Sequence, residues 1–164
     1  MAESKAMKID VTEENEMDLI TGLLKAAEYK NEMRQTINIK RDGCSLFKFA
    51  IRPLSFDEIT ECRKKATTFI PNPKGASLPM IEKEISTEDY MAWQIYTATV
   101  AEKNGKKIWD DPALKQGLAN AGHMIVTAAD IIKTVLIAGE LDSVSDAVLD
   151  FSGNNTNVVE YAKN

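Results

Sequence analysis

The stretch TINIKRDGCSLFKFAIRPLSFDEITECRKKAT, residues 36–67, decides the fold, because its hydrophobic period changes half-way along. In its first part, apolar and polar residues alternate on both sides of the dipeptide Asp42-Gly43. Asp-Gly between two alternating runs is typical of a β-hairpin, since the tight turn needs positive φ angles. The sequence therefore predicts a hairpin over about residues 36–52. An isolated hairpin is marginal in water, so this one must pack against helices or pair with another strand.

The second part of the stretch predicts the start of a helix. Ser55 and Glu58 have the spacing of a capping box, in which each side chain accepts a hydrogen bond from the backbone of the other residue. Leu54 and Ile59 are placed for a hydrophobic staple across the same helix start. The basic residues 63–65 then fall in the last turns, where cations suit the negative end of the helix dipole.

Apolar residues at three- and four-residue spacing predict further helices on both sides of this stretch. The expected helices are 12–32, from Ser86 or Thr87 to about Glu102, from Asp111-Pro112 to about Asn120, from Thr127 to a C-terminal glycine at Gly139, and from Asp142 or Ser143 to Gly153. Residues 69–86 hold three prolines and are expected to form a long loop. The fold class is a helix-dominated α+β protein in which one hairpin packs with five to six helices.

The chain of 164 residues is long enough for one domain with its own core. Residues 12–153 are expected to form a single α+β domain, between a flexible N-terminus (1–11) and a loose C-terminal tail (154–164). The helix over 12–32 has a narrow apolar stripe and a polar connector, so it is expected to be able to detach. Removing residues 1–32 should then leave a folded domain.

Charge and hydropathy exclude some classes of function. The net charge is −5, and basic residues do not concentrate into the face that nucleic-acid binding requires. The basic excess over 34–83 and the acidic excess after it are compatible with electrostatic self-association. No apolar stretch is long enough to span a membrane and the N-terminus is no secretory signal, so we expect a soluble intracellular protein.

The acidic stretch LIAGELDSVSDAVLDFSG, residues 136–153, raises the question of a metal or acid/base site. At about 100° per residue, Asp142, Asp146 and Asp150 fall on one stripe of a helix, opposite the apolar side chains. Calcium loops need a different spacing with a central glycine. We interpret the acids as a solvated face, because catalytic carboxylates need burial or a close partner.

No other motif predicts catalysis. His123 is the only histidine, and Cys44 and Cys62 lack metal-ligand spacing. Phosphate-binding and dinucleotide-binding glycine motifs are absent from the sequence. We therefore expect no enzyme activity, no catalytic residues, no cofactor and no metal. A deep cleft lined by Glu102, His123 or Asp130 would reopen the alternative of a small enzyme.

The order of elements resembles the XkdN-like tail assembly chaperones of tailed bacteriophages and prophages. The resemblance rests on the hairpin leading into RPLSFDEITECRKKAT (52–67), on EDYMAWQIYTATV (88–100) with KNGKKIWDDPALKQGL (103–118), on TAADIIKTVLIAGELDSVSDAVLDFSG (127–153), and on the overall size. It covers roughly residues 35–153.

This resemblance implies a late-expressed protein of the bacterial host cytoplasm that is absent from the finished virion. Such chaperones keep the aggregation-prone tape measure protein soluble until tail-tube subunits polymerise around it. The resemblance also implies, as further partners, a longer form of the same protein made by ribosomal frameshifting, and tail-tube subunits. The alternative function is a virion structural protein, such as a tail-tube, neck or baseplate subunit.

A chaperone of apolar helices needs an apolar groove or a helix that can exchange its packing. Two segments offer one: the N-terminal helix and the terminal pair of helices around Gly139. The candidate partner-binding residues are Met17, Ile20, Leu23, Leu24, Val135, Leu141, Val144 and Val148. The competing interpretation is that these side chains are ordinary core, the commoner fate of such stripes.

Overall fold

The structure is a computed structural model that describes residues 16–153. The N-terminal segment 1–11, the first residues of the helix expected from 12, and the C-terminal tail lie outside the described residues. The elements are α1 (Glu16–Glu32), β1 (Gln35–Arg41), β2 (Cys44–Ile51), α2 (Phe56–Ala66), β3 (Thr67–Ile70), β4 (Ile81–Ile85), α3 (Thr87–Ala98), the short 3₁₀ helix η2 (Ile108–Asp110), α4 (Pro112–Asn120), α5 (Ala128–Val135) and α6 (Ala138–Phe151). The predicted helix-dominated α+β class is confirmed.

The predicted hairpin is confirmed as β1 and β2, an antiparallel pair that runs from Gln35↔Ile51 to Arg41↔Cys44. Asp42 and Gly43 form the turn with φ angles of 51° and 77°, the positive values that Asp-Gly tolerates. At its other end, β2 pairs with the segment that follows α3, through an antiparallel bridge between Ile51 and Thr99. Arg52 N–H donates to the Ala98 carbonyl (2.9 Å) and Val100 N–H donates to the Ala50 carbonyl (2.8 Å). These bonds tie the hairpin to the helices.

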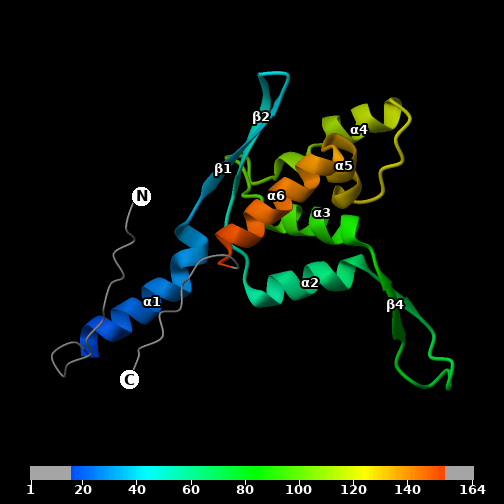
Figure 1. Cartoon of the computed structure of the whole chain (residues 1–164), viewed down its shortest axis with the longest axis horizontal. Coiled ribbons are helices and arrows are strands. Elements are labelled where there is room, and N and C mark those ends of the chain that lie inside the picture. The colour runs from blue at the N-terminus through cyan, green and yellow to red at the C-terminus, as the bar shows by residue number, and fades with distance from the viewer. Residues whose placement is uncertain (1–15, 154–164) are drawn as a thin grey trace.

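The core lies where the hairpin packs against α3, α5 and α6 (Figure 1). Its buried residues are Ile39, Phe49, Ile51, Leu54, Ala92, Ile95, Ala98, Trp109, Ala129, Ile131, Ile132, Leu136, Leu141, Val144 and Val148. Trp109 is 1% exposed and meets the rings of Phe47 and Phe49 edge-on. The helices thus supply the apolar cover that an isolated hairpin lacks.

The capping box at the start of α2 is confirmed. Ser55 Oγ accepts from Glu58 N–H (3.3 Å), and the Glu58 carboxylate accepts from Ser55 N–H (2.8 Å). Arg52 donates two further hydrogen bonds to Glu58, at 2.6 and 3.1 Å. These bonds, with Arg52 contributing most, lower the pKa of the Glu58 carboxyl to about 2.

Replacing Glu58 by Gln is expected to lower the free energy of unfolding by about 1–2 kcal/mol at pH 7. The lowered pKa stabilises the fold above the unfolded value of about 4.3, and this contribution disappears as the pH falls towards about 2. Urea denaturation at neutral and acidic pH should therefore show the wild type and E58Q converging in acid. Glu61→Gln, at an exposed ion pair with Lys64, is the control and should have little effect. If the difference in unfolding free energy between the wild type and E58Q did not change with pH, the ionic explanation would be refuted.

The expected loop over 69–86 is wrong in part, because it contains a second hairpin. β3 and β4 pair antiparallel from Thr67↔Ile85 to Ile70↔Ile81, with a register shift between Thr68 and Phe69. The hairpin extends from the connection between α2 and α3, away from the body (Figure 1). Only the prolines and the turn between the strands remain irregular. We call this hairpin the arm.

Two helix boundaries also differ from the prediction. α3 begins after Ser86, as predicted, and Ser86 Oγ accepts from Asp89 N–H, but the helix ends at Ala98 instead of near Glu102. α5 ends at Val135 instead of at Gly139, and Gly139 lies in the first turn of α6. The final helix therefore begins at Ala138, four residues before the predicted cap at Asp142. The helix starts at Asp111-Pro112 and at Thr127 are confirmed.

Candidate partner-binding site

α1 carries an apolar stripe that is largely exposed. Leu19, Ile20, Leu23 and Leu24 are 45%, 57%, 58% and 62% exposed. Ile20, Leu23 and Leu24 follow Leu19 by one, four and five residues, and this spacing places all four side chains on one helix face. α1 lies to one side of the body and is joined to β1 by the two residues Met33 and Arg34 (Figure 1). The stripe is therefore open to another protein.

The eight candidate residues do not form one surface. Ile20, Leu23 and Leu24 lie on the exposed stripe of α1, whereas the side chain of Met17 lies outside the described residues. Leu141 and Val144 are 5% exposed and Val148 is fully buried, so all three are core residues in this conformation. Val135 is half-buried and packs against that core. Contact between a partner and Val135, Leu141, Val144 or Val148 stays a prediction. For the three buried residues, such contact requires α6 to leave the core.

Leu19 belongs to the stripe but was not among the predicted residues. The signal in the sequence was its position directly before Ile20 and four residues before Leu23. With Leu19 included, the apolar face is broad enough to pack against another helix, because such faces span at least about 100°. The stripe is therefore wider than the sequence pattern alone suggested.

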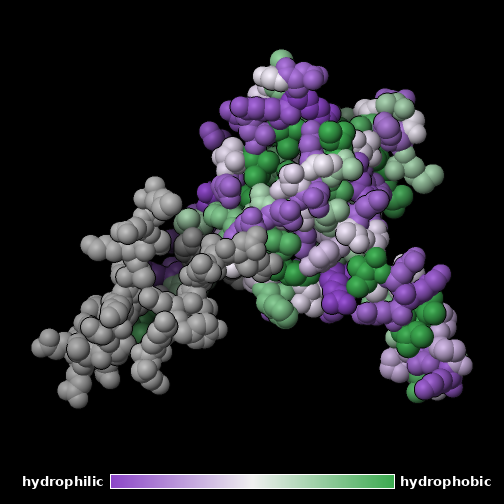
Figure 2. Space-filling model, in the orientation of Figure 1, coloured by the Kyte–Doolittle hydropathy of each residue, from purple (hydrophilic) through white to green (hydrophobic). Residues whose placement is uncertain are grey.

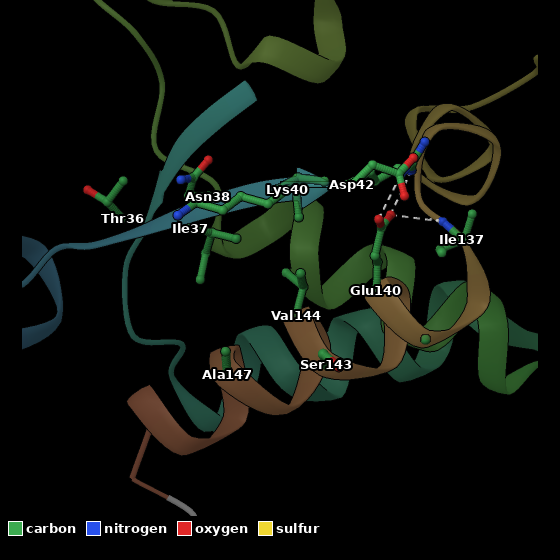
Figure 3. A pocket seen from close by; sticks show the side chains of 13 residues that line it. Thr36, Ile37, Asn38, Lys40, Asp42, Ile137, Glu140, Ser143, Val144 and Ala147 are labelled. Carbon is green, nitrogen blue, oxygen red and sulfur yellow. Dashed lines mark hydrogen bonds and ion pairs between the residues drawn. The ribbon is translucent and has the colours of Figure 1, made fainter. Parts of the chain in front are cut away.

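A second candidate surface is an open groove of about 830 Å³ between β1 and α6, with a mixed apolar and polar lining. It is lined by residues 36–42 of the hairpin and by residues of the α6 segment, from Ile137 to Ala147. Figure 3 shows Ile37 and Val144 directed toward one another across this groove, with Ser143 and Ala147 further along the helix. Its lining includes the buried side chains of Ile39 and Val144 and the exposed side chains of Thr36, Lys40 and Asp42.

An ion pair fixes one end of the groove. Arg41 donates to both Glu140 carboxylate oxygens at 2.7 Å and to the Val135 carbonyl oxygen at 2.8 Å. Glu140 also accepts from Ile137 N–H at 3.1 Å. The hydrogen bonds from Arg41 hold the pKa of the Glu140 carboxyl below its usual value. Arg41 thus joins the hairpin to the step between α5 and α6.

The acidic stretch 136–153 divides into two roles. Asp142, Asp146 and Asp150 are exposed on the outer face of α6, as the sequence pattern predicted. Glu140 instead holds Arg41 and the start of α6. Within residues 16–153, no group of three or more His, Cys, Asp or Glu side chains could hold a metal ion.

The residues that would have reopened the enzyme alternative have separate surroundings. His123 is exposed in the connection between α4 and α5. Asp130 accepts hydrogen bonds from the N–H groups of Val126 and Thr127 at the start of α5 (3.0 and 2.9 Å). Glu102 lines a small hollow beside Ile108 and Pro112. Among the described helices, none is long and apolar enough to cross a membrane.

The chain is similar to a known family of proteins. The model of the family described as phage XkdN-like tail assembly chaperone protein matches residues 20–163. This range includes Ile20, Leu23 and Leu24 of α1 as well as the whole body and the arm. No curated protein and no solved structure matches the chain significantly.

Proposed function

Because the chain belongs to the phage XkdN-like tail assembly chaperone family, we propose that it binds the tape measure protein and keeps it soluble during tail assembly. In this proposal the chaperone acts in the host cytoplasm, has no catalytic role, and leaves before the virion is complete. The expected client is a long helical protein whose apolar stripes would otherwise associate with one another.

The observation that carries this proposal is the exposed stripe of α1. Monomeric soluble proteins rarely leave large apolar side chains grouped on one face, and such groups mark interaction sites. Here Leu19, Ile20, Leu23 and Leu24 present that group on a helix, the element best suited to pack against another helix. α1 can therefore cover an apolar stripe of the client while its polar face stays in water.

The groove between β1 and α6 provides a second place for an apolar side chain of the client. It is open to solvent, and Ile37 and Ile137 contribute apolar atoms to it. α1 and β1 are consecutive in the chain, so one client segment that packs along α1 can continue towards the groove (Figure 1). We therefore propose α1 as the main contact and the groove as an additional one.

The experiment is co-expression with the tape measure protein encoded nearby, followed by affinity capture and size-exclusion chromatography with light scattering. We expect a soluble complex that contains several copies of this chain for each tape measure protein, whereas the tape measure protein alone aggregates. A tape measure protein that stays insoluble, with this chain eluting alone, would contradict the proposal. Detection of the chain in purified virions by mass spectrometry would favour the alternative of a tail-tube, neck or baseplate subunit.

A further inference from the structure

The arm exposes apolar side chains far from the stripe of α1. Phe69, Leu78, Met80, Ile81 and Ile85 are between 38% and 57% exposed. Figure 2 shows apolar residues on the arm, interleaved with polar ones, where it extends from the body. β3 and β4 form a sheet of two strands in the described part of the chain. Two-stranded sheets are marginal in water, and they become stable with more strands or with a helix against them.

The two open edges of the arm differ in charge. β4 has the sequence IEKEI, with Glu82, Lys83 and Glu84 all exposed. If two β4 strands paired antiparallel about a two-fold axis centred on any of these three, that residue would face its own copy. Like charges directly opposite one another destabilise a strand pair. The charges on β4 thus disfavour self-pairing, as charged residues on edge strands usually do.

β3 has the sequence TTFI and no charge. Ser86 N–H donates to the Ala66 carbonyl oxygen at 2.9 Å. Thr68 pairs with Glu84 and Phe69 with Glu82, so the extra residue at the register shift, Lys83, lies on β4 and the alternation along β3 continues. The backbone groups of residues 66, 68 and 70 therefore point toward β4. The backbone N–H and C=O groups of Thr67 and Phe69 then point the other way, to the open edge of β3. Thr67 N–H already donates to the Lys64 carbonyl oxygen. Phe69 is therefore the residue of β3 that can both donate and accept at this edge.

We propose that two copies of this chain associate through their β3 strands, which pair antiparallel about a two-fold axis at Phe69. Phe69 of each copy exchanges both backbone hydrogen bonds with Phe69 of the other. The product is a four-stranded sheet with uncharged strands in the centre and the charged β4 strands at the outside, the arrangement that protects sheet edges. It also meets the need of the arm for more strands.

Strands of four residues make a small contact, so we expect a dimer weaker than interfaces that bury roughly 1,200 Å² or more. Analytical ultracentrifugation of the full chain from micromolar to millimolar concentration should show a reversible monomer–dimer equilibrium. Phe69→Lys places two ammonium groups opposite one another and should raise the dissociation constant about tenfold or more. Leu78→Lys, in the turn of the same arm, is the matched control and should leave the equilibrium within about twofold, because it adds the same charge away from the β3 edge.

A disulfide tests the register. Opposite residues in a hydrogen-bonded antiparallel pair have Cα atoms about 5.5 Å apart, within the range that a disulfide spans. In a Cys44→Ser background, which removes the exposed native thiol, Phe69→Cys should form a covalent dimer when oxidised glutathione accepts the two electrons. Glu84→Cys on β4 should not, because two strands separate it from its copy.

A chain that stays monomeric at every concentration, and whose Phe69→Cys variant does not cross-link, would overturn the proposal. So would a Phe69→Lys variant that sediments like the wild type but loses the tape measure protein, since the arm would then belong to the client site. Self-association of the chain alone does not depend on the tape measure protein. The proposal can therefore fail while the chaperone function stands, and the reverse also holds.

Discussion

Replacing both Leu23 and Leu24 by Glu is expected to abolish capture of the tape measure protein while leaving the domain folded. The two side chains are 58% and 62% exposed, so their loss removes little packing within the chain. Burial of each leucine against a client contributes about 1.5–3 kcal/mol. Losing both contacts should weaken binding by at least about a hundredfold, and burying two carboxylates in an apolar contact weakens it further.

The control for this variant is Thr21→Glu with Lys25→Glu, on the other side of α1. This pair adds more negative charge than the leucine variant does, but it leaves Leu19, Ile20, Leu23 and Leu24 in place. Binding to the tape measure protein should be measured by co-purification, and folding by thermal unfolding followed by circular dichroism. We expect the control to bind and both variants to unfold near the wild-type temperature.

Three outcomes would contradict this account of α1. Wild-type binding by the leucine variant would move the client site to the groove between β1 and α6. Equal loss in the control would mean that charge, and not the apolar stripe, governs binding. A large loss of stability in the leucine variant would mean that the stripe packs within the molecule, in which case a chain lacking residues 1–32 would also fail to fold.

The elements that could be predicted from the sequence are those whose signals are local. Asp42-Gly43 determines its own turn, since both φ angles are positive. Ser55 and Glu58 satisfy each other's backbone across a single helical turn. Asp111 caps α4 and Pro112 occupies its first turn. In each case the residues that decide the structure are at most three positions apart, so the pattern is visible without tertiary contacts.

The end of α5 could not be predicted because the deciding contact is distant in sequence. The sequence predicts that the helix ends at Gly139, but Arg41 donates to the carbonyl oxygen of Val135 and the helix ends there. That contact joins residues 94 positions apart. Glu140, whose carboxylate the same guanidinium binds, then accepts from the N–H of Ile137 and begins α6. A glycine after the last turn is one way to satisfy the terminal carbonyl groups of a helix, and here the Arg41 guanidinium satisfies that of Val135, four residues before Gly139.

The arm was missed for a different reason. β4 reads IEKEI, and all five of its residues are exposed, so it lacks the buried face that produces alternation. β3 has only four residues and directly follows α2. Strand prediction relies on one face being apolar, and a hairpin with both faces in water does not show that pattern.

The candidate site was predicted in part. The spacing of Ile20, Leu23 and Leu24 marked an apolar helix face, and the structure leaves that face open. The same kind of spacing marked Leu141, Val144 and Val148, which the structure buries. Periodicity shows that a face is apolar but not what covers it. For α6 the cover is α3 and the hairpin, whereas the stripe of α1 stays largely exposed, and only the folded arrangement reveals this difference.

Replacing Trp109 by Ala is expected to cause the largest loss of stability, about 3–5 kcal/mol. Trp109 is 1% exposed, and its ring centroid lies 6.0 Å from that of Phe47 and 5.4 Å from that of Phe49. Its indole N–H donates to Thr99 Oγ1 at 2.9 Å, and Thr99 Oγ1 donates to the Ile95 carbonyl oxygen. The side chain thus joins the hairpin to the C-terminal end of α3. Since a domain of this size is stable by about 5–15 kcal/mol, the variant should be close to unfolding.

Trp93→Ala is the matched control, because Trp93 is the other tryptophan of the chain and is only half-buried. It contacts the Tyr96 ring at 5.6 Å and the Lys65 ammonium at 4.4 Å, near the surface of α3. Urea denaturation followed by circular dichroism should give a loss of about 1–2 kcal/mol for this variant, well below that of Trp109→Ala. Equal losses in the two variants would show that the contact between hairpin and helices at Trp109 is not the centre of the core. Because α1 does not pack against that core, the leucine variant of α1 and Trp109→Ala should have additive effects on stability.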